Sequence, residues 1–212
     1  MSVEVKICGL STPETVDAAV AGGARWVGFA TYPRSPRHVT TETLRSLAQR
    51  VPRTVGRVSF FVAADDALID ERVAAGALDL LQLHGSESPE RVADIKRRTG
   101  KPVMMVITVA EAADVERGIA AYAAVADRLM FDAAAGILPG GNAKAFDWTI
   151  LSGRKVPLPW LLAGGLTPDN VAEAVRVTGA HAVDVSSGVE SSRGVKSIAL
   201  IHAFLERAAA GS

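Results

Sequence analysis

Two side chains in this sequence are placed to move protons. Cys8 follows the predicted strand Val3–Ile7, and Asp132 ends the predicted strand Arg128–Asp132. A thiol and a carboxyl group that face one bound substrate can serve as its acid and base without a cofactor. Lys6 alternates onto the same face as Cys8, and a nearby cation favours the reactive thiolate. The alternatives are a buried cysteine that fills the core and an aspartate that caps a loop. Spacing alone does not say which group is the acid.

Two loops have the composition of an anion-binding site. Gly164-Gly165 follows one apolar run, and Ser186-Ser187-Gly188 follows the next. Glycines let backbone N–H groups approach an anion closely, and serine hydroxyls add donors. Asp184 lies in the last run, two residues before the first serine, and so shares its face. These residues predict a phosphate site, with tight turns alone as the alternative.

Arg37 and His84 complete the set of candidate side chains. Arg37 ends the segment Tyr32-Pro33-Arg34-Ser35-Pro36-Arg37, whose two prolines stiffen the backbone. Such a loop could hold a guanidinium for bidentate binding of a carboxylate, and the alternative is a solvated surface arginine. His84 follows the run Leu78–Leu83. The four histidines lack the spacing of metal ligands, and no dinucleotide or Walker-type glycine motif is present, so we expect neither a metal nor a nucleotide cofactor.

An alternation of strands and helices must position these residues. Short β-branched or leucine-rich runs recur along the chain, each followed by an amphipathic stretch. Hydroxyl residues placed before prolines, at Thr12, Ser88 and Thr167, predict helix starts. The predicted strands are Val3–Ile7, Trp26–Ala30, Thr54–Phe61, Leu78–Leu83, Pro102–Thr108, Arg128–Asp132, Trp160–Ala163 and His181–Val185. Eight helices are predicted, including Ala67–Ala75, Glu90–Arg98, Val171–Val177, Ile198–Arg207 and a short one near Asp147–Leu151.

Strict alternation predicts parallel strands joined by helical crossovers, either in a closed barrel or in an open doubly wound sheet. The central strands of an open sheet are apolar on both faces. Here the two faces differ, because polar side chains alternate with apolar ones in several runs. We therefore predict an α/β fold, a single-domain TIM (β/α)8 barrel over residues 1–212, with its site at the carboxyl ends of the strands. The residues that this alternation turns inward at the mouth are Cys8, His84, Asp132 and Asp184.

Length and composition restrict the class of protein. The chain has 212 residues, 49% of them hydrophobic, which suits one folded domain and excludes a disordered chain. Lys+Arg and Asp+Glu both number 23, and this balance argues against a nucleic-acid or anionic-membrane partner. The one cysteine cannot form an intrachain disulfide, Glu4 and Lys6 interrupt any signal peptide, and no apolar run is long enough to cross a bilayer. We therefore expect a soluble, cytoplasmic protein.

Seven segments at the ends of predicted strands carry a resemblance to a known family. They are Lys6-Ile7-Cys8-Gly9-Leu10, Gly28-Phe29 with Ser35-Pro36-Arg37, Leu81-Gln82-Leu83-His84-Gly85, Asp132, Gly140-Gly141 with Phe146-Asp147-Trp148, Ala163-Gly164-Gly165-Leu166, and Asp184-Val185-Ser186-Ser187-Gly188-Val189-Glu190. In this order they resemble the phosphoribosylanthranilate isomerase family of tryptophan biosynthesis, and the resemblance runs nearly end to end.

The resemblance implies a phosphorylated sugar–anthranilate substrate and a reaction without a cofactor. The reaction is the Amadori rearrangement of N-(5'-phosphoribosyl)anthranilate, an aminoaldose, to the aminoketose 1-(2-carboxyphenylamino)-1-deoxyribulose 5-phosphate. Asp132 matches the general acid that protonates the ribose ring oxygen, and Cys8 matches the general base that takes the proton from C2. Arg37 matches the anchor of the anthranilate carboxylate. The matches to the phosphate cradle are Gly164, Gly165, Ser186, Ser187 and Gly188. The resemblance leaves a monomer or a homodimer open.

One departure and two alternatives limit the resemblance. Gly141 is followed by Asn142 and Ala143, where the family usually has threonine and glycine, so no site residue is carried over from this loop. The first alternative is a dual-substrate sugar isomerase of the histidine and tryptophan pathways, which generally uses two aspartates. The second is a catalytically silent barrel scaffold, which would need neither Cys8 nor Asp132. The cysteine–aspartate pair favours the single-substrate isomerase.

Overall fold

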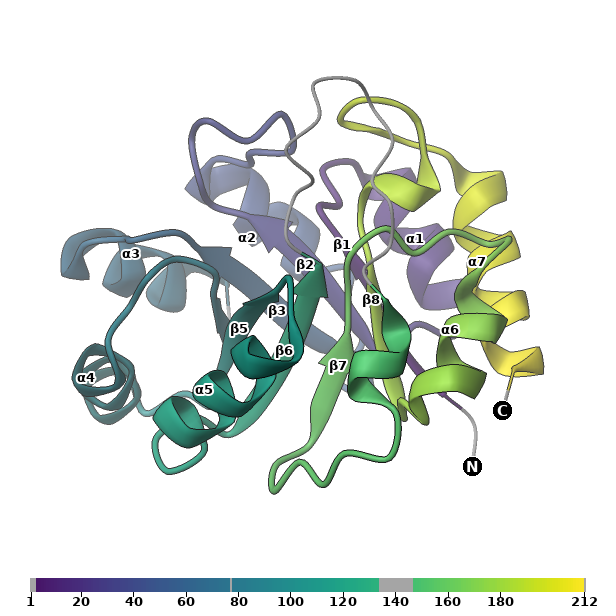
Figure 1. Cartoon of the computed structure of the whole chain (residues 1–212). Coiled ribbons are helices and arrows are strands. Elements are labelled where there is room, and N and C mark those ends of the chain that lie inside the picture. The colour runs from purple at the N-terminus through teal and green to yellow at the C-terminus, as the bar shows by residue number, and fades with distance from the viewer. Residues whose placement is uncertain (1–2, 77, 134–146, 212) are drawn as a thin grey trace.

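Eight parallel strands form a closed barrel in the computed structural model, which describes residues 3–76, 78–133 and 147–211 (Figure 1). Neighbouring strands follow the order of the sequence, and β1 pairs with β8 to close the ring. Lys6 lies opposite Asp184 in that pairing, and Ile7 lies opposite Val185. The closure confirms the predicted barrel and excludes the open sheet. The strands are β1 Glu4–Cys8, β2 Trp26–Ala30, β3 Gly56–Phe61, β4 Leu80–Leu83, β5 Val103–Val109, β6 Arg128–Ala133, β7 Trp160–Leu162 and β8 Ala182–Val185.

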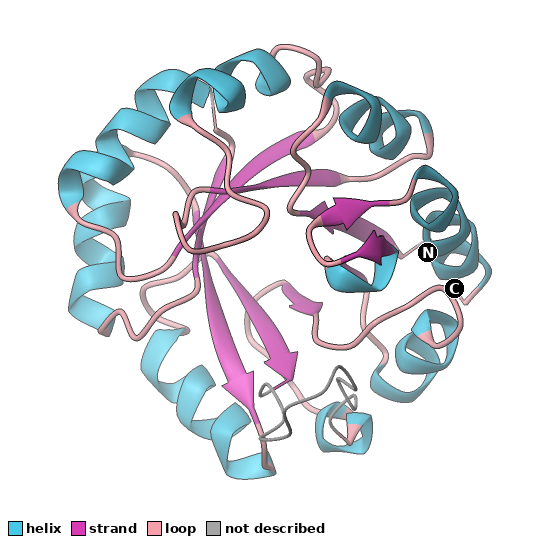
Figure 2. Ribbon diagram, turned by 90° about the horizontal axis from the view of Figure 1, so that it is seen from above, coloured by secondary structure: helices cyan, strands magenta, loops and turns pink. Residues whose placement is uncertain are grey.

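The helices form a ring outside the strands, as a view along the barrel shows (Figure 2). They are α1 Pro13–Ala21, α2 Thr41–Ala48, α3 Asp66–Gly76, α4 Pro89–Thr99, α5 Ala112–Tyr122, α6 Val171–Thr178 and α7 Ile198–Ala210. The short helix expected between β6 and β7 is the 3-10 helix η1 Trp148–Leu151. Within the described part of the chain, no helix is long and apolar enough to cross a membrane.

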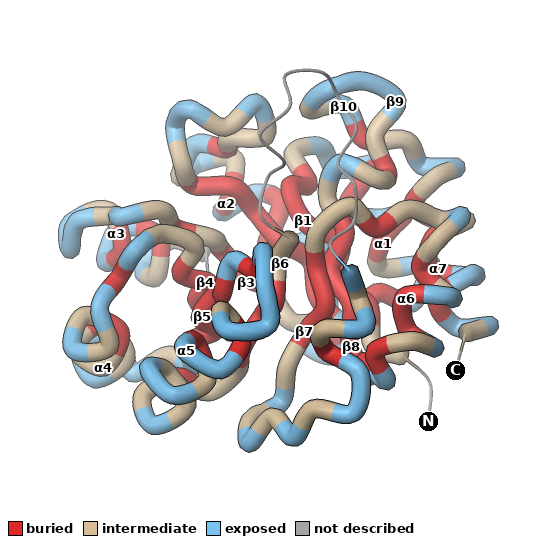
Figure 3. Tube along the Cα trace, viewed as in Figure 1, coloured by how far each residue is buried: buried red, intermediate tan, exposed pale blue. Residues whose placement is uncertain are grey.

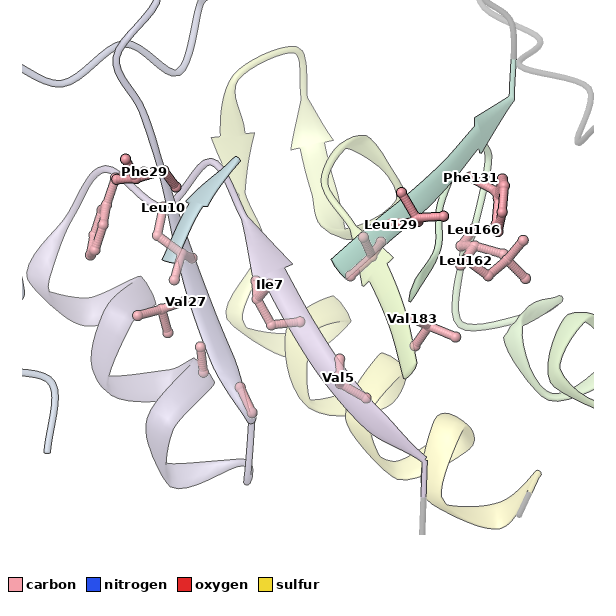
Figure 4. Packing of buried hydrophobic residues seen from close by; sticks show 14 of the residues in the cluster. Val5, Ile7, Leu10, Val27, Phe29, Leu129, Phe131, Leu162, Leu166 and Val183 are labelled. Carbon is pink, nitrogen blue, oxygen red and sulfur yellow. The ribbon is translucent and has the colours of Figure 1, made fainter. Parts of the chain in front are cut away.

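Alternating residues of the strands divide the core into two layers. Outward-facing side chains such as Ile7, Val27 and Phe131 are buried in a large cluster between the strands and the helices (Figures 3 and 4). Inward-facing side chains such as Met104 and Met130 fill the barrel in a separate buried cluster. Burial of apolar side chains on both sides of the strands stabilises the barrel and fixes which residues face its axis.

Local signals account for the helix ends, with one exception. The Thr12 hydroxyl accepts a hydrogen bond from the backbone N–H of Thr15 at 3.4 Å, so Thr12 caps α1 as predicted. Thr167 does not cap α6. Its N–H instead donates to Asn170 Oδ1 at 2.8 Å in a turn that delays the helix to Val171. The prediction at Thr167 was wrong because the N–H of Asn170, which a capping Thr167 hydroxyl would bind, donates instead to the Thr167 carbonyl oxygen at 3.3 Å.

Two further differences concern the carboxyl-end loops. The antiparallel hairpin of β9 Glu190–Ser192 and β10 Val195–Lys196 follows the short 3-10 helix η2 Ser187–Val189 and was not predicted. It lies at the end of the barrel opposite the N-terminus (Figure 3). The departure at Asn142-Ala143 lies in residues 134–146, outside the described residues.

Candidate active site

A cavity of about 550 Å³ opens at the carboxyl ends of the strands. This volume is within the range of small-molecule sites. Part of its wall was missed by the sequence reasoning, namely the side chains of Tyr32, Phe60 and Val62, which could face an aromatic ring. All ten predicted site residues line the cavity, and they are Cys8, Arg37, His84, Asp132, Gly164, Gly165, Asp184, Ser186, Ser187 and Gly188.

Cys8 lies above a buried ion pair inside the barrel. The Lys6 side chain is completely buried, and its Nζ donates to Asp184 Oδ1 at 2.7 Å. The parallel register of β1 and β8 places these two residues opposite each other. Gly28 on β2 leaves room for the cluster, because a Cβ there would lie 3.0 Å from Cys8 Sγ and 3.1 Å from Lys6 Nζ. The thiol therefore faces a confined, charged interior.

Burial raises the pKa of the Cys8 thiol above its usual value of 9.0, and the positive charge of Lys6 opposes this shift. Asp184 raises the pKa of Cys8 further, since a second negative charge beside it is unfavourable. Burial also disfavours the charged form of Lys6, but the charge and hydrogen bond of Asp184, together with those of Cys8, outweigh burial and bring the pKa of Lys6 to about 12. The predicted influence of Lys6 on Cys8 thus has the right sign, but burial outweighs it, so the resting group is the neutral thiol.

We expect the alkylation of Cys8 by iodoacetamide to accelerate about tenfold per pH unit from about pH 6 to about pH 9. The thiolate is the nucleophile, and a raised pKa keeps it a small fraction throughout this range. Cys8 is the only cysteine of the chain, so the modified mass reports it alone. The same measurement on unfolded protein is the control and should be faster at neutral pH. A rate in the folded protein that levels off below about pH 8 would contradict the raised pKa.

Asp132 lies across the mouth on β6, within reach of His84. Its Oδ2 is 3.3 Å from His84 Nε2, and His84 Nδ1 is 3.3 Å from the amide nitrogen of Gln82. The other amide atom, Gln82 Oε1, is buried and makes no hydrogen bond within the described residues. Gln82 belongs to the motif Leu81-Gln82-Leu83-His84-Gly85 and was not predicted as a site residue. Its amide contacts the imidazole ring of His84, which in turn contacts Asp132.

Gly164 and Gly188 let the loops after β7 and β8 pack closely. Gly164 adopts φ +89°, and a Cβ there would lie 2.8 Å from Asp132 Oδ1 and 2.3 Å from the backbone nitrogen of Ala133. At Gly188 a Cβ would lie 1.8 Å from the carbonyl oxygen of Leu166. The loops after β7 and β8 therefore lie side by side, and the first of them also adjoins Asp132. These contacts show why glycine is needed at both positions.

Arg37 is held beside the mouth by residues on both sides. Its Nε donates to Glu190 Oε1 at 2.5 Å and its Nη2 to Glu190 Oε2 at 2.8 Å. Gly9, next to Cys8, adopts φ +76°, and a Cβ there would lie 2.5 Å from Arg37 Cδ. Spacing alone could not identify Glu190 as the partner of Arg37, since 153 positions separate them. Across the described residues, no group of three or more histidine, cysteine, aspartate or glutamate side chains could hold a metal ion.

Comparison with known sequences and structures relates this geometry to one family. A family model described as N-(5'-phosphoribosyl)anthranilate (PRA) isomerase matches residues 5–207. The N-(5'-phosphoribosyl)anthranilate isomerase of Paramagnetospirillum magneticum is 53% identical over 214 residues, which cover 100% of this chain and 99% of the relative. That of Paracoccus denitrificans is 53% identical over 213 residues, covering 99% of each.

Solved structures give the same relation. The phosphoribosylanthranilate isomerase of Thermotoga maritima is 34% identical and superimposes with a TM-score of 0.88 over 97% of this chain and 98% of its own. A phosphoribosylanthranilate isomerase in complex with reduced 1-(o-carboxyphenylamino)-1-deoxyribulose 5-phosphate is 33% identical, with a TM-score of 0.83 over 97% of this chain and 98% of its own. Monomers generated from the dimeric Thermotoga maritima enzyme are 33% identical, with a TM-score of 0.83 over 97% of this chain and 98% of their own.

Proposed function

Because the chain belongs to the N-(5'-phosphoribosyl)anthranilate isomerase family, we propose that its cavity performs the family's reaction with Cys8 as general base and Asp132 as general acid. The reaction is the rearrangement of N-(5'-phosphoribosyl)anthranilate to 1-(2-carboxyphenylamino)-1-deoxyribulose 5-phosphate in L-tryptophan biosynthesis. We further propose that residues 1–212 act as one barrel domain, since the family match spans residues 5–207.

The chemistry requires one proton donor and one proton acceptor. Asp132 gives its proton to the ribose ring oxygen, the C1–O bond breaks, and the nitrogen lone pair forms an iminium at C1. Cys8, as the thiolate, then takes the proton from C2, and the C2–H electrons form an enolamine. Tautomerisation of the enol at C2, with a proton added at C1, gives the ketone. No electrons enter or leave the substrate as a whole, so this sequence of proton transfers needs no redox partner.

One observation carries the proposal: Cys8 and Asp132, from strands far apart in the sequence, line one cavity together with two sets of anion-binding groups. We assign Gly164, Gly165 and the segment Ser186-Ser187-Gly188 to the substrate phosphate. Arg37 is assigned to the anthranilate carboxylate, because a guanidinium matches a carboxylate in charge and shape. His84 is placed to contact Asp132 and the substrate beside it. Anchoring the substrate at both of its anionic groups would hold the ribose between the base and the acid.

The proposal is tested by assaying the purified protein with the aminoaldose of the tryptophan pathway and with that of the histidine pathway. We expect turnover of the first alone. Turnover of both would support the dual-substrate alternative, and turnover of neither would support the silent scaffold. Neither alternative is favoured by the family relation. Rescue of a tryptophan auxotroph that lacks the isomerase gives an independent readout.

For the oligomeric state we propose a monomer or a homodimer. A related enzyme is dimeric and also yields monomers, so both forms occur among the structural neighbours. We propose that this chain works in the cytoplasm on a small phosphorylated substrate, without nucleic acid or membrane. The balanced charge, with 23 basic and 23 acidic residues, supports the absence of a nucleic-acid or anionic-membrane partner.

Replacing Arg37 with alanine should raise KM by about 10- to 100-fold and change kcat little. The variant loses hydrogen bonds from a charged donor to the substrate, and these are worth about 1.5–3 kcal/mol each. Arg34, on the same loop, is exposed and does not line the cavity, so Arg34→Ala is the matched control. Steady-state kinetics of both variants gives the comparison. An unchanged KM in Arg37→Ala would remove Arg37 from the carboxylate site.

A further inference from the structure

Glu190 makes four hydrogen bonds at the rim of the cavity without lining it. Besides the two from Arg37, it accepts one from Lys196 Nζ at 2.8 Å and one from the backbone N–H of Gly194 at 3.0 Å. The Glu190 side chain is only 4% exposed and that of Lys196 only 1%. A carboxylate buried this far and bonded on both oxygens is fixed in position.

Glu190 is negatively charged beside the two cations Arg37 and Lys196. Burial by itself disfavours the charged form of Glu190, but hydrogen bonds from Arg37 and Lys196 outweigh it and bring the pKa of Glu190 to about 2. The carboxylate is therefore ionised over the physiological range. Arg37 and Lys196 carry two positive charges against the one negative charge of Glu190, so these three groups together have a net positive charge.

Glu190 leaves part of Arg37 free for a ligand. The pair uses Nε and one N–H of Nη2, so within the described residues three of the five guanidinium donors, on Nη1 and Nη2, make no hydrogen bond. Since Arg37 lines the cavity, these donors are available to a carboxylate there. A free arginine would lose side-chain entropy on binding, whereas this one is already ordered.

Lys196 connects the same carboxylate to the other anion site. Its Nζ donates to the carbonyl oxygen of Ser186 at 2.7 Å and lies 3.2 Å from the Ser186 hydroxyl. The β9–β10 hairpin that carries Glu190 and Lys196 also contacts the Arg37 loop, because a Cβ at Gly194 would lie 3.0 Å from the carbonyl oxygen of Pro36. One hairpin thus contacts both the loop that carries Arg37 and the loop after β8.

We propose that Glu190 is a positioning residue that fixes Arg37 for the substrate carboxylate, and that Lys196 joins this pair to the loop assigned to the phosphate. The inference rests on the proposed function. It makes the β9–β10 hairpin a determinant of specificity, because the hairpin sets the orientation of the group that distinguishes a carboxylated from an uncarboxylated aromatic amine.

The test compares Glu190→Gln with the wild type in kinetics and in binding of the reduced aminoketose phosphate, a stable analogue. Glutamine keeps the shape but removes the charge and one acceptor. We expect KM and the analogue Kd to rise about tenfold with kcat unchanged, because the lost interaction affects binding alone. The affinity for inorganic phosphate should fall less than the affinity for the analogue, because Lys196 keeps its own hydrogen bond to the Ser186 carbonyl oxygen. An unchanged KM and Kd would overturn the inference.

Two controls separate positioning from a general loss of structure. Glu173→Gln removes a similar bidentate partner from Arg176 on the exposed face of α6 and should change neither KM nor Kd. In an Arg37→Ala background, Glu190→Gln should add no further increase in KM, whereas a purely structural role would add its effect again. If Glu190→Gln does not fold, Glu190→Asp decides: a raised KM with normal kcat supports the inference, and a normal KM overturns it.

Failure of this inference is distinguishable from failure of the proposed function. A wild-type protein that converts the aminoaldose, with a Glu190→Gln variant of equal KM and Kd, rejects only the role of Glu190. A wild-type protein without isomerase activity rejects the function. The analogue would then still report whether Glu190 acts through Arg37, because binding requires no turnover.

Discussion

Asp132→Asn should lower kcat by about 10²- to 10⁴-fold, the usual contribution of a general acid or base. An asparagine amide has nearly the shape of the carboxylic acid but has no acidic proton to give to the ring oxygen, so the ribose ring should stay closed. The analogue Kd should change far less than kcat, because the phosphate and carboxylate contacts remain. Steady-state kinetics and calorimetric binding measure the two effects.

The control for Asp132→Asn is the same substitution at Asp169, which is exposed in the loop after β7. Asp169→Asn should keep wild-type kinetics. Thermal unfolding of both variants should stay near that of the wild type, since Asp132 is partly exposed and His84 keeps a hydrogen-bonding partner in asparagine. An Asp132→Asn enzyme with kcat within about threefold of the wild type would reject Asp132 as the acid.

Cys8→Ser should lower kcat by a similar factor, about 10²- to 10⁴-fold. The serine hydroxyl fits the space left by Gly28, but it does not ionise at working pH and is a far weaker base than a thiolate. In the wild type, kcat/KM should rise as the pH rises toward the raised pKa of Cys8, because only the thiolate accepts the proton. This slope should be absent in Cys8→Ser.

Cys8→Ala provides the control for the serine variant. It removes the sulfur without leaving a hydroxyl in the charged interior beside Lys6, so similar losses in both variants would assign the effect to the thiol. Binding of the reduced analogue should persist in both. Near-wild-type turnover in either variant would show that another group accepts the C2 proton.

The barrel could be predicted because its signals are local and repeated. Alternating faces in β1, with Lys6 and Cys8 opposite Val5 and Ile7, already separate the barrel interior from the helix-facing layer. The proline-associated caps locate helix starts such as Ser88 before α4, whose hydroxyl accepts from the N–H of Arg91. The edges of the strands moved by at most two residues, because hydrogen bonding between neighbouring strands sets them, and α7 ends at Ala210, three residues beyond its predicted end.

The hairpin and the Thr167 turn could not be predicted in the same way. The hairpin strands are two or three residues long and contain one hydrophobic residue, Val195, so they have no hydrophobic period. Asn170 accepts from the N–H of Thr167 and donates to the carbonyl oxygen of Gly165, and neither bond leaves a trace in composition. The Thr167 turn is decided by local hydrogen bonds of the Asn170 side chain, and the hairpin by contacts with distant residues such as Arg37.

The sequence predicted ten of the residues that line the cavity, but not its electrostatics. Strand ends converge in a barrel, so the position of Cys8 or Asp132 after a strand was enough to place it at the mouth. Whether Lys6 would activate Cys8 depends on burial and on Asp184, whose negative charge offsets the positive charge of the lysine. Pairing between distant segments, as for Arg37 and Glu190, requires the folded chain.

The most direct test of the account is a crystal structure of this chain with the reduced aminoketose phosphate bound. We predict the Cys8 sulfur within about 4 Å of C2, and the Asp132 carboxyl group within about 3.2 Å of the oxygen on C4, which closes the ring in the substrate. A bound analogue whose C2 or C4 oxygen lies more than about 6 Å from these respective side chains would contradict the assignment of base and acid.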